Sequence, residues 1–211
     1  MFYSTATDKA YELFYSYIEE AKEANSLKQV NGFNGRNQVF NYDLQLGESL
    51  EDYVKSFINN ELEGYECVKL EYQSDLYEQY NHVDLLVYKN GTPYCCFDCK
   101  ALMCYMKKSE QFFGIPPQNN IAINYYSLCD YKKNTLPTFV LVYNDTTHPD
   151  NQAGFYIQNV KNIHFDDKYI LQQNNRNGLG SYKYNLDNRT FKYSSDLKNL
   201  LTNEKTKFKK G

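Results

Sequence analysis

The sequence predicts an α/β fold, in which helices cover a mixed β-sheet, and three observations support this prediction. Apolar side chains recur at helical spacing over residues 5–27 and 48–62. The elements follow the order helix, three strands, helix and further strands, and 211 residues are enough for one substantial core, so we expect a single domain. Runs rich in aliphatic and aromatic residues, typical of strands, occupy residues 65–70, 83–88, 94–99, 138–143 and 155–160.

Two amphipathic helices are expected before the first strand. The first helix, over residues 5–27, places apolar groups on one face, at Tyr11, Phe14, Tyr15, Ile18 and Ala21. Residues 31–47 are rich in turn residues and predict a loop. The second helix, over residues 48–62, has Gly47 before it and Gly64 at its end.

The remaining elements follow from the change of pattern after Gly64. Asn90-Gly91 lies between two apolar runs and predicts a hairpin. Residues 138–143 are apolar without alternation, which is typical of a central strand covered on both faces. The other expectations are a strand over 65–70, a loop or short helical turn over 72–81, a helix over 119–131, a strand over 155–160 and a hairpin over 180–193, with 101–117 ambiguous.

The single domain is expected to have three segments. Residues 1–44 form an N-terminal helix and loop, and residues 45–165 form the core. Residues 166–211 form a C-terminal extension of hairpin or helix with a basic tail, packed on the same domain.

Composition and charge exclude some classes of protein. A net charge of −3 and a pI near 5.7 argue against a protein held to nucleic acid by overall charge. They do not exclude binding of nucleic acid through a local basic groove. No apolar run approaches the roughly 18–20 residues that span a bilayer, and the N-terminus lacks a secretory pattern, so we expect no membrane contact and a cytoplasmic, intracellular location. The six cysteines include only one C-x-x-C, at Cys96 and Cys99, and are expected to be reduced, buried and apolar rather than zinc ligands.

Three ionisable residues lie at the ends of the two hairpin strands: Asp84 begins the first, and Asp98 and Lys100 end the second. Because side chains alternate along a strand, Asp98 and Lys100 share one face. Regular pairing around a two-residue loop would turn Asp84 to the opposite face. A three-residue loop or a one-residue bulge sets Asp84 opposite Asp98, and Pro93 favours such an irregularity. We therefore predict that two carboxylates and an ammonium converge on one face.

Two carboxylates so close together repel, so one must be protonated or both must share a cation. Mg²⁺ prefers oxygen ligands and often takes one or two carboxylates, so the pair predicts a Mg²⁺ site at which Mn²⁺ substitutes. Such an ion can lower the pKa of a bound water and stabilise charge that develops on phosphorus and on a leaving oxygen, with Lys100 orienting or deprotonating the water or stabilising the charged phosphate. The competing interpretation is a surface ion pair between Asp98 and Lys100, with Asp84 capping the start of its strand.

Together these residues resemble a known family. Gly47-x-x-x-Glu51-x-x-Val54, Val83-Asp84 and Asp98-Cys99-Lys100 are similar to the motifs of the PD-(D/E)XK nuclease superfamily, over about residues 45–160. The resemblance implies the restriction-endonuclease-like fold, a mixed central sheet flanked by helices. It implies metal binding by Asp84, Asp98, Glu51 and the backbone carbonyl of Cys99, with Lys100 as the catalytic lysine beside Asp98, Asp84 and Glu51.

The sequence departs from the family pattern at some positions. Val83 stands where the family has proline. Glu48, one helical turn before Glu51, is a second candidate for the acid on the first core helix, although the spacing favours Glu51. Many members have a Gln or Lys on the helix after the third strand, for which the candidates here are Gln118, Asn120 and Asn124.

Contacts to the substrate are expected outside the acid group. Gln118, Lys107 and Lys108 are the expected substrate-binding residues, and the two lysines could equally belong to a solvated loop. Tyr125-Tyr126 could stack on bases, although aromatic helix faces more often belong to a core.

The function expected from these features is metal-dependent endonuclease activity on DNA, of a restriction-type, structure-specific, mobile-element or phage enzyme. Cleavage of both strands of a duplex needs two active sites, so a homodimer is expected. The alternatives are a non-catalytic nucleic-acid-binding or assembly module of the same fold, which the acidic pI favours, and an RNA endonuclease.

Overall fold

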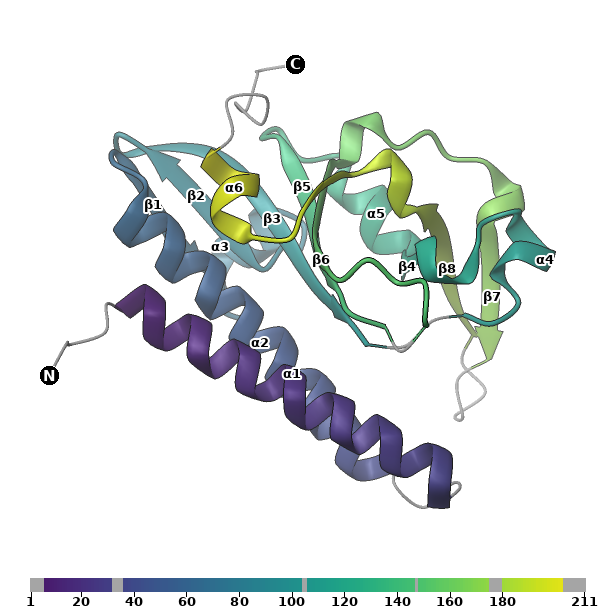
Figure 1. Ribbon diagram of the computed structural model, residues 1–211. Coiled ribbons are helices and arrows are strands. Elements are labelled where there is room, and N and C mark those ends of the chain that lie inside the picture. Colours follow the sequence, from purple (N-terminus) through teal and green to yellow (C-terminus); the bar gives the residue numbers. More distant parts are fainter. Residues whose placement is uncertain (1–5, 32–35, 104–105, 147, 175–179, 203–211) are drawn as a thin grey trace, which may run out of the picture.

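The computed structural model describes residues 6–31, 36–103, 106–146, 148–174 and 180–202, and describes residues 24–31, 36–43, 173–174 and 180 by their backbone alone. Within these ranges the central sheet has six strands, and β3 and β5 run parallel while the other neighbours are antiparallel. The chain is therefore a single-domain α/β protein with a mixed central sheet (Figure 1). The strand order is β1 (Tyr65–Lys69), β2 (Leu85–Lys89), β3 (Thr92–Leu102), β5 (Thr138–Asn144), β6 (Gly154–Asn159) and β9 (Lys192–Ser194).

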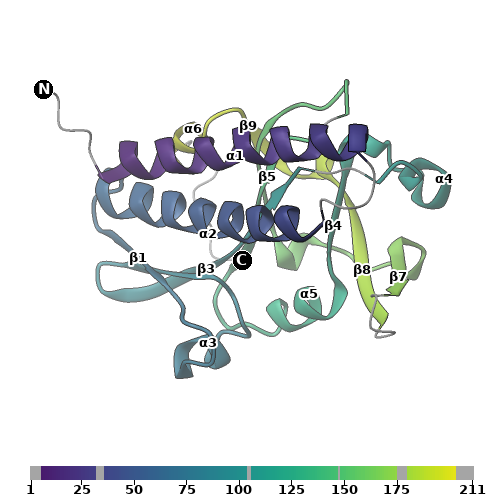
Figure 2. The ribbon, with the colours of Figure 1, turned by 90° about the horizontal axis from the view of Figure 1, so that it is seen from below.

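Two long helices, α1 (Ala6–Asn31) and α2 (Arg36–Glu61), pair with each other and cover one face of this sheet (Figures 1 and 2). Their apolar faces bury Phe14 and Leu50 against Phe97 and Leu141 of the strands. The short helix α6 (Leu197–Thr202) packs into the same cluster. Phe97 and Cys99 of β3 pack into this apolar layer. Because side chains alternate along a strand, Asp98 and Lys100 lie on the other face of β3.

The opposite face is covered by a second, antiparallel sheet of order β4 (Asn120–Asn124), β8 (Gly180–Asp187) and β7 (Ile170–Asn174), together with α5 (Tyr125–Tyr131). Helix α3 (Asp75–Gln79) lies on the same side as α5 (Figure 2). Val140 and Val142 of β5 pack there against Ile121, Ile123 and Tyr184. The remaining short elements are α4 (Ser109–Phe113) and the 3-10 turns η2 (Pro117–Asn119), η3 (Val160–Asn162), η4 (Asp167–Tyr169) and η5 (Asn188–Thr190).

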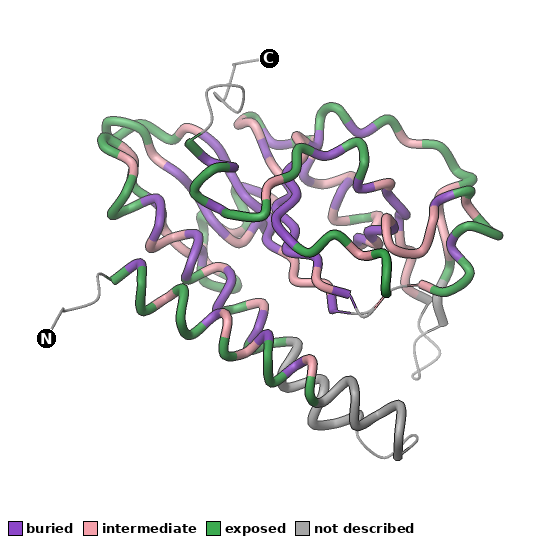
Figure 3. The backbone as a smooth tube through the Cα atoms, viewed as in Figure 1, coloured by how far each residue is buried: buried purple, intermediate pink, exposed green. Residues whose placement is uncertain are grey.

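Several element predictions are confirmed. The helices over 5–27 and 48–62, the strands over 65–70 and 155–160 and the short helical turn within 72–81 are all present. The apolar run over 138–143 is β5, which lies between β3 and β6 and is buried along most of its length (Figure 3). Of the predicted basic tail, Lys192 lies in β9 and Lys198 in α6, and residues 203–211 lie outside the described residues.

Three element predictions are wrong, in each case because another helix or strand packs against the segment or pairs with it. The loop expected over 31–47 is helical from residue 36, where α2 packs against α1 despite the weak helix propensity of Asn. Residues 120–124, expected to be helical, form β4, because β8 supplies their pairing partner. Residues 180–193 are no hairpin, since β8 pairs with β7 and β4 while β9 joins β6 in the other sheet.

The cysteines behave as small apolar residues where they are described. Cys67, Cys95, Cys96 and Cys99 are buried and free, and Cys129 is free and half-buried. Burial raises the pKa of the Cys67 and Cys96 thiols to about 12, so they remain protonated and unreactive at neutral pH. Cys104 lies outside the described residues.

The β2–β3 hairpin has the register that places Asp84 opposite Asp98. Asn90 and Gly91, with φ of 50° and 75°, form a two-residue loop, and Tyr94 is an extra residue that bulges from β3. Beyond the bulge the register continues to Asp84, whose N–H donates to the carbonyl of Phe97 at 3.1 Å. The one-residue bulge offered by the sequence is therefore confirmed.

Two glycines offer a matched test of the backbone. Gly154 has a φ of 149°, and a Cβ there would approach the carbonyl oxygen of Ser194 to 2.7 Å. We expect Gly154→Ala to lower the free energy of unfolding by about 1–3 kcal/mol.

Gly47 lies inside α2 with open space around it, so Gly47→Ala should raise the free energy of unfolding by about 0.5–1 kcal/mol. Urea unfolding of both variants checks that the two changes in the free energy of unfolding have opposite signs. Destabilisation by Gly47→Ala would contradict the placement of Gly47 inside a continuous helix α2.

None of the helices within the described ranges combines the length and the hydropathy needed to span a bilayer.

Candidate active site

The open end of the β2–β3 hairpin brings Asp84, Asp98 and Lys100 together. The Lys100 ammonium donates to Asp98 Oδ1 at 2.7 Å and to the backbone carbonyl of Cys99 at 3.1 Å. Its Nζ lies 3.5 Å from Asp84 Oδ2. Oxygens from all three of the hairpin residues that were expected to bind a metal ion therefore surround one cationic group.

Asp98 is the more buried of the two acids. Its side chain is 1% exposed, against 21% for Asp84. Besides Lys100, its Oδ1 accepts a hydrogen bond from the Tyr131 hydroxyl at 2.6 Å. Its Oδ2 is buried and has no hydrogen-bond partner among the described residues. Because a buried carboxylate oxygen without a partner is costly, this oxygen favours a ligand that brings positive charge.

Charges within the cluster shift one another's pKa. Burial raises the pKa of Asp84, and the Asp98 carboxylate raises it further against the opposing effect of Lys100. Burial alone lowers the pKa of Lys100, but the carboxylates of Asp98 and Asp84 outweigh that effect and raise it. Asp84 Oδ2 also accepts the backbone N–H of Cys99 at 2.6 Å, which fixes its direction. With both acids ionised, one ammonium leaves the cluster negatively charged.

Glu51 and Glu48 both line the pocket beside this cluster. Glu51 Oε2 lies 2.8 Å from Lys69 Nζ, in an ion pair that the sequence did not predict. Burial raises the pKa of Glu51 more than Lys69 lowers it, and the charge of Glu51 adds to the raised pKa of Asp84. Glu51 thus acts electrostatically on Asp84, and its role as a metal ligand stays a prediction.

An open pocket of about 940 Å³ gives access to the cluster. Asp84 and Lys100 line it together with Glu51 of α2, Lys69 of β1 and Tyr77 of α3. A volume of this size is in the range of pockets that hold nucleotide-sized ligands.

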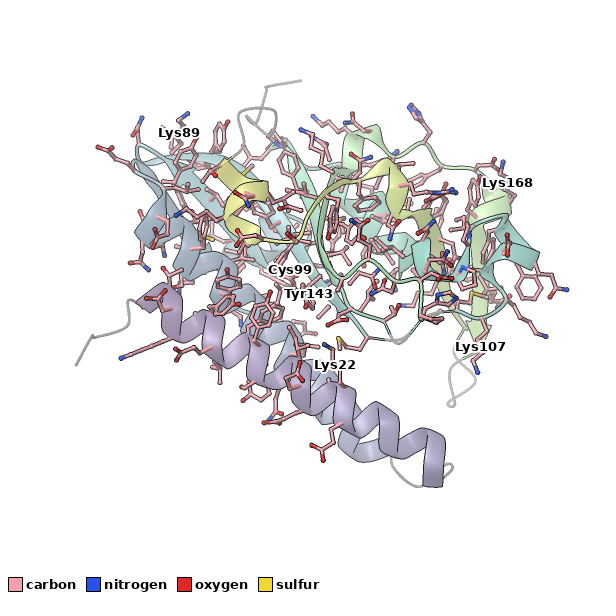
Figure 4. The ribbon with its side chains drawn as sticks, in the orientation of Figure 1. Lys22, Lys89, Cys99, Lys107, Tyr143 and Lys168 are labelled. Atoms are coloured by element: carbon pink, nitrogen blue, oxygen red, sulfur yellow. The ribbon has the colours of Figure 1, made fainter. Side chains whose placement is uncertain are left out.

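The three expected substrate-binding residues lie elsewhere. Lys107 and Lys108 are exposed in the turn before α4, and Lys107 points to solvent well away from Cys99 (Figure 4). Gln118 is in η2, where its backbone carbonyl accepts a hydrogen bond from Asn188. Within the described part of the chain, the pocket lining includes none of the three, so their contact with substrate stays a prediction.

Tyr131 and Lys183 are functional candidates that the sequence did not reveal. Burial and the nearby Asp98 raise the pKa of Tyr131, so its hydroxyl remains a hydrogen-bond donor that positions Asp98. Burial lowers the pKa of Lys183, and the positive charge of Lys100 lowers it further. Both residues come from the layer that covers the Asp98 face of the central sheet, Tyr131 from α5 and Lys183 from β8, and no local pattern marks either of them.

The oxygens of the cluster fit a hard divalent cation. Mg²⁺ typically takes one or two carboxylates and completes its shell with water and phosphate oxygens. The unpartnered Oδ2 of Asp98, the Oδ2 of Asp84 and the Cys99 carbonyl are ligands of this kind. In the part of the chain that the structure describes, no three His, Cys, Asp or Glu side chains group closely enough to hold a metal, so the fit rests on two carboxylates and one backbone carbonyl.

Comparison with protein-family models, with curated proteins and with solved structures gives no match to this chain.

Proposed function

We propose that this protein is a Mg²⁺-dependent endonuclease that hydrolyses phosphodiester bonds of DNA, with Mn²⁺ as a substitute, on a restriction-endonuclease-like fold. One observation supports the proposal most: Asp84, Asp98 and the Cys99 carbonyl converge on a single cationic group beside an open pocket. The competing interpretation of a surface ion pair is disfavoured by the burial of Asp98 and by its unpartnered Oδ2.

The roles of the residues follow from their positions. Asp84, Asp98 and the Cys99 carbonyl would hold the Mg²⁺ ion. When bound, the ion supplies positive charge that favours deprotonation of water and offsets charge developing on the phosphate. Burial lowers the pKa of Lys100, but Asp98 and Asp84 raise it by more, so Lys100 stays protonated and its role is to stabilise charge on a phosphate oxygen rather than to accept a proton. Tyr131 positions Asp98 through the hydrogen bond to its Oδ1.

The positive charge available for a polyanion is local. Lys55, Lys69 and Lys100 line the pocket beside the acids Glu48, Glu51, Glu71 and Asp84, and the chain as a whole has a net charge of −3. Local ammonium groups attract phosphates whatever the net charge of the protein. Cleavage of both strands of a duplex would still need two copies of the chain, so for that substrate we propose a homodimer.

Incubation of the protein with labelled duplex DNA, branched DNA and RNA, each with Mg²⁺ and with a chelator, tests the proposal. We expect cleavage of a DNA substrate at internal positions with Mg²⁺ and none with the chelator. Cleavage of RNA alone would favour the alternative of an RNA endonuclease. Absence of cleavage of all three substrates would contradict the proposal and favour a non-catalytic module.

Metal affinity provides an independent prediction. Asp98→Asn removes a charged ligand, so we expect the affinity for Mg²⁺ or Mn²⁺ to fall by about tenfold or more in calorimetric titration. Asp166→Asn changes an exposed carboxylate that pairs with Lys168, and serves as the matched control with unchanged affinity. Equal affinities of wild type and Asp98→Asn would place the metal elsewhere.

A further inference from the structure

Three aromatic rings form a column beside the acid cluster, from the segment that joins β1 to β2. The ring of Tyr77 stacks on the ring of His82 with a centroid separation of 4.9 Å and an interplanar angle of 24°. Tyr72 meets Tyr77 edge-on at 5.7 Å. Tyr72 is 77% exposed, more than the other exposed large hydrophobic residues of the described ranges. We call these three residues the aromatic column.

The column is held in place by the backbone around it. Asn81 and His82 both have positive φ, 55° and 65°, a conformation that non-glycine residues adopt only when their surroundings impose it. The His82 N–H donates to the carbonyl of Tyr77 at 2.8 Å, and His82 Nε2 lies 2.8 Å from Glu78 Oε2. The Asn81 side chain donates to Asn134, which ties the turn to the segment before β5. The rings of Tyr77 and His82 are therefore positioned before a ligand arrives, and Tyr72 rests edge-on against Tyr77.

The position of the column relates it to the proposed chemistry. Tyr72 and Tyr77 line the same pocket as Asp84 and Lys100. Burial raises the pKa of Tyr77 and the charge of Asp84 raises it further, and both residues line this pocket. A nucleotide whose phosphate lies at Lys100 would therefore have its neighbouring base within reach of the column.

We propose that the aromatic column stacks on an unpaired base, so that the substrate of the proposed endonuclease is a single-stranded or unpaired segment of nucleic acid. The inference rests on the proposed function. Stacking on an aromatic side chain needs an exposed base face, and in a duplex those faces are covered by neighbouring bases. Stacking also adds affinity that does not depend on charge, which suits a chain whose net charge is only −3 and whose basic groups near the site are few. An unpaired strand needs one active site, so a single copy of the chain suffices for this substrate.

Fluorescence anisotropy tests the inference with labelled oligonucleotides of about 12 nucleotides, within the usual site sizes for single-strand binding. The ligands are single-stranded DNA, single-stranded RNA and blunt duplex DNA, in a chelator so that binding is measured apart from turnover. We expect the single strands to bind at least tenfold more tightly than the duplex. Tyr72→Ala should lower single-strand affinity about tenfold and leave duplex affinity unchanged, whereas Tyr72→Phe should retain the wild-type value.

Two further variants serve as controls. Phe112→Ala removes an aromatic of α4 that is 52% exposed and outside the pocket lining, and should leave binding unchanged. Tyr126→Ala removes an exposed tyrosine of α5 that contacts Tyr182. Loss of single-strand binding in Tyr126→Ala but not in Tyr72→Ala would overturn the inference. Since Tyr72 is largely exposed, its replacement should leave the melting temperature unchanged.

The failure of this inference differs from the failure of the proposed function. Equal or tighter binding of duplex, or unchanged single-strand affinity in Tyr72→Ala, overturns the aromatic column as a base-stacking site even if Mg²⁺-dependent cleavage is observed. Absence of both binding and cleavage of every nucleic acid by the wild-type protein overturns the endonuclease itself. Tight binding of single-stranded DNA and RNA alike supports stacking, which does not depend on the sugar.

Discussion

Replacement of Lys100 by alanine is expected to lower Mg²⁺-dependent cleavage at least about a hundredfold, the size of effect seen when a group that stabilises only the transition state is removed. The Lys100 ammonium sits between the two acids and the Cys99 carbonyl, and lines the pocket through which a phosphate would enter. The initial rate on a labelled oligonucleotide, measured at saturating Mg²⁺, gives the fold-change.

A measurement of metal affinity separates an effect of Lys100 on turnover from an effect on metal binding. Lys100 contributes positive charge to the oxygens that would hold the ion, so Lys100→Ala should bind Mg²⁺ or Mn²⁺ at least as tightly as the wild type while turnover falls. Asp98→Asn should lower both quantities. If Lys100→Ala lost metal affinity and activity together, the lysine would only hold the metal ligands in position and would not act on the phosphate.

The matched control for Lys100 is another lysine in an ion pair. Lys168 pairs with Asp166 at 3.0 Å on the surface, far from Cys99 in Figure 4. Lys168→Ala should retain wild-type activity, and a circular dichroism spectrum of each variant checks that the fold is kept. Equal activity of wild type and Lys100→Ala would indicate a contaminating nuclease or a wrong site.

The second large effect concerns stability. Phe14 of α1 is fully buried, and its ring meets those of Tyr53, Tyr143 and Phe155 at centroid distances of 5.9, 5.0 and 6.3 Å. Phe14→Ala removes these contacts and leaves a cavity between α1, α2 and the sheet. We therefore expect the free energy of unfolding to fall by about 3–5 kcal/mol. For a chain of this length the melting temperature should fall by roughly 10 °C.

Leu13 provides the control for Phe14, because it is the neighbouring apolar residue of α1 and is 49% exposed. Leu13→Ala should change the free energy of unfolding by less than about 1 kcal/mol. Urea unfolding of both variants measures the difference. Similar losses in the two variants would show that α1 does not present this face to the sheet in solution.

The sequence by itself determined several of the helices and strands and the parity of the hairpin. The turn residues Asn90-Gly91, the irregularity at Pro93 and the alternation of side chains were enough to place Asp84 opposite Asp98 on the face that Lys100 shares. This was possible because a hairpin pairs residues that are close in the chain, so turn geometry fixes the register. The apolar run of β5 identified a central strand for a similar reason, since burial on both faces removes the alternation.

Only the tertiary structure decided what surrounds that hairpin. Tyr131 donates to Asp98, Glu51 pairs with Lys69, and the charge of Lys100 lowers the pKa of Lys183, although the residues of each pair lie on different elements. Residues 120–124 likewise became a strand because β8 was there to pair with them. Side-chain periodicity reports which face of an element is apolar, but it contains no information about which distant element will cover that face. Contacts between distant segments depend on how whole layers pack, and that packing is decided by the folded chain as a unit.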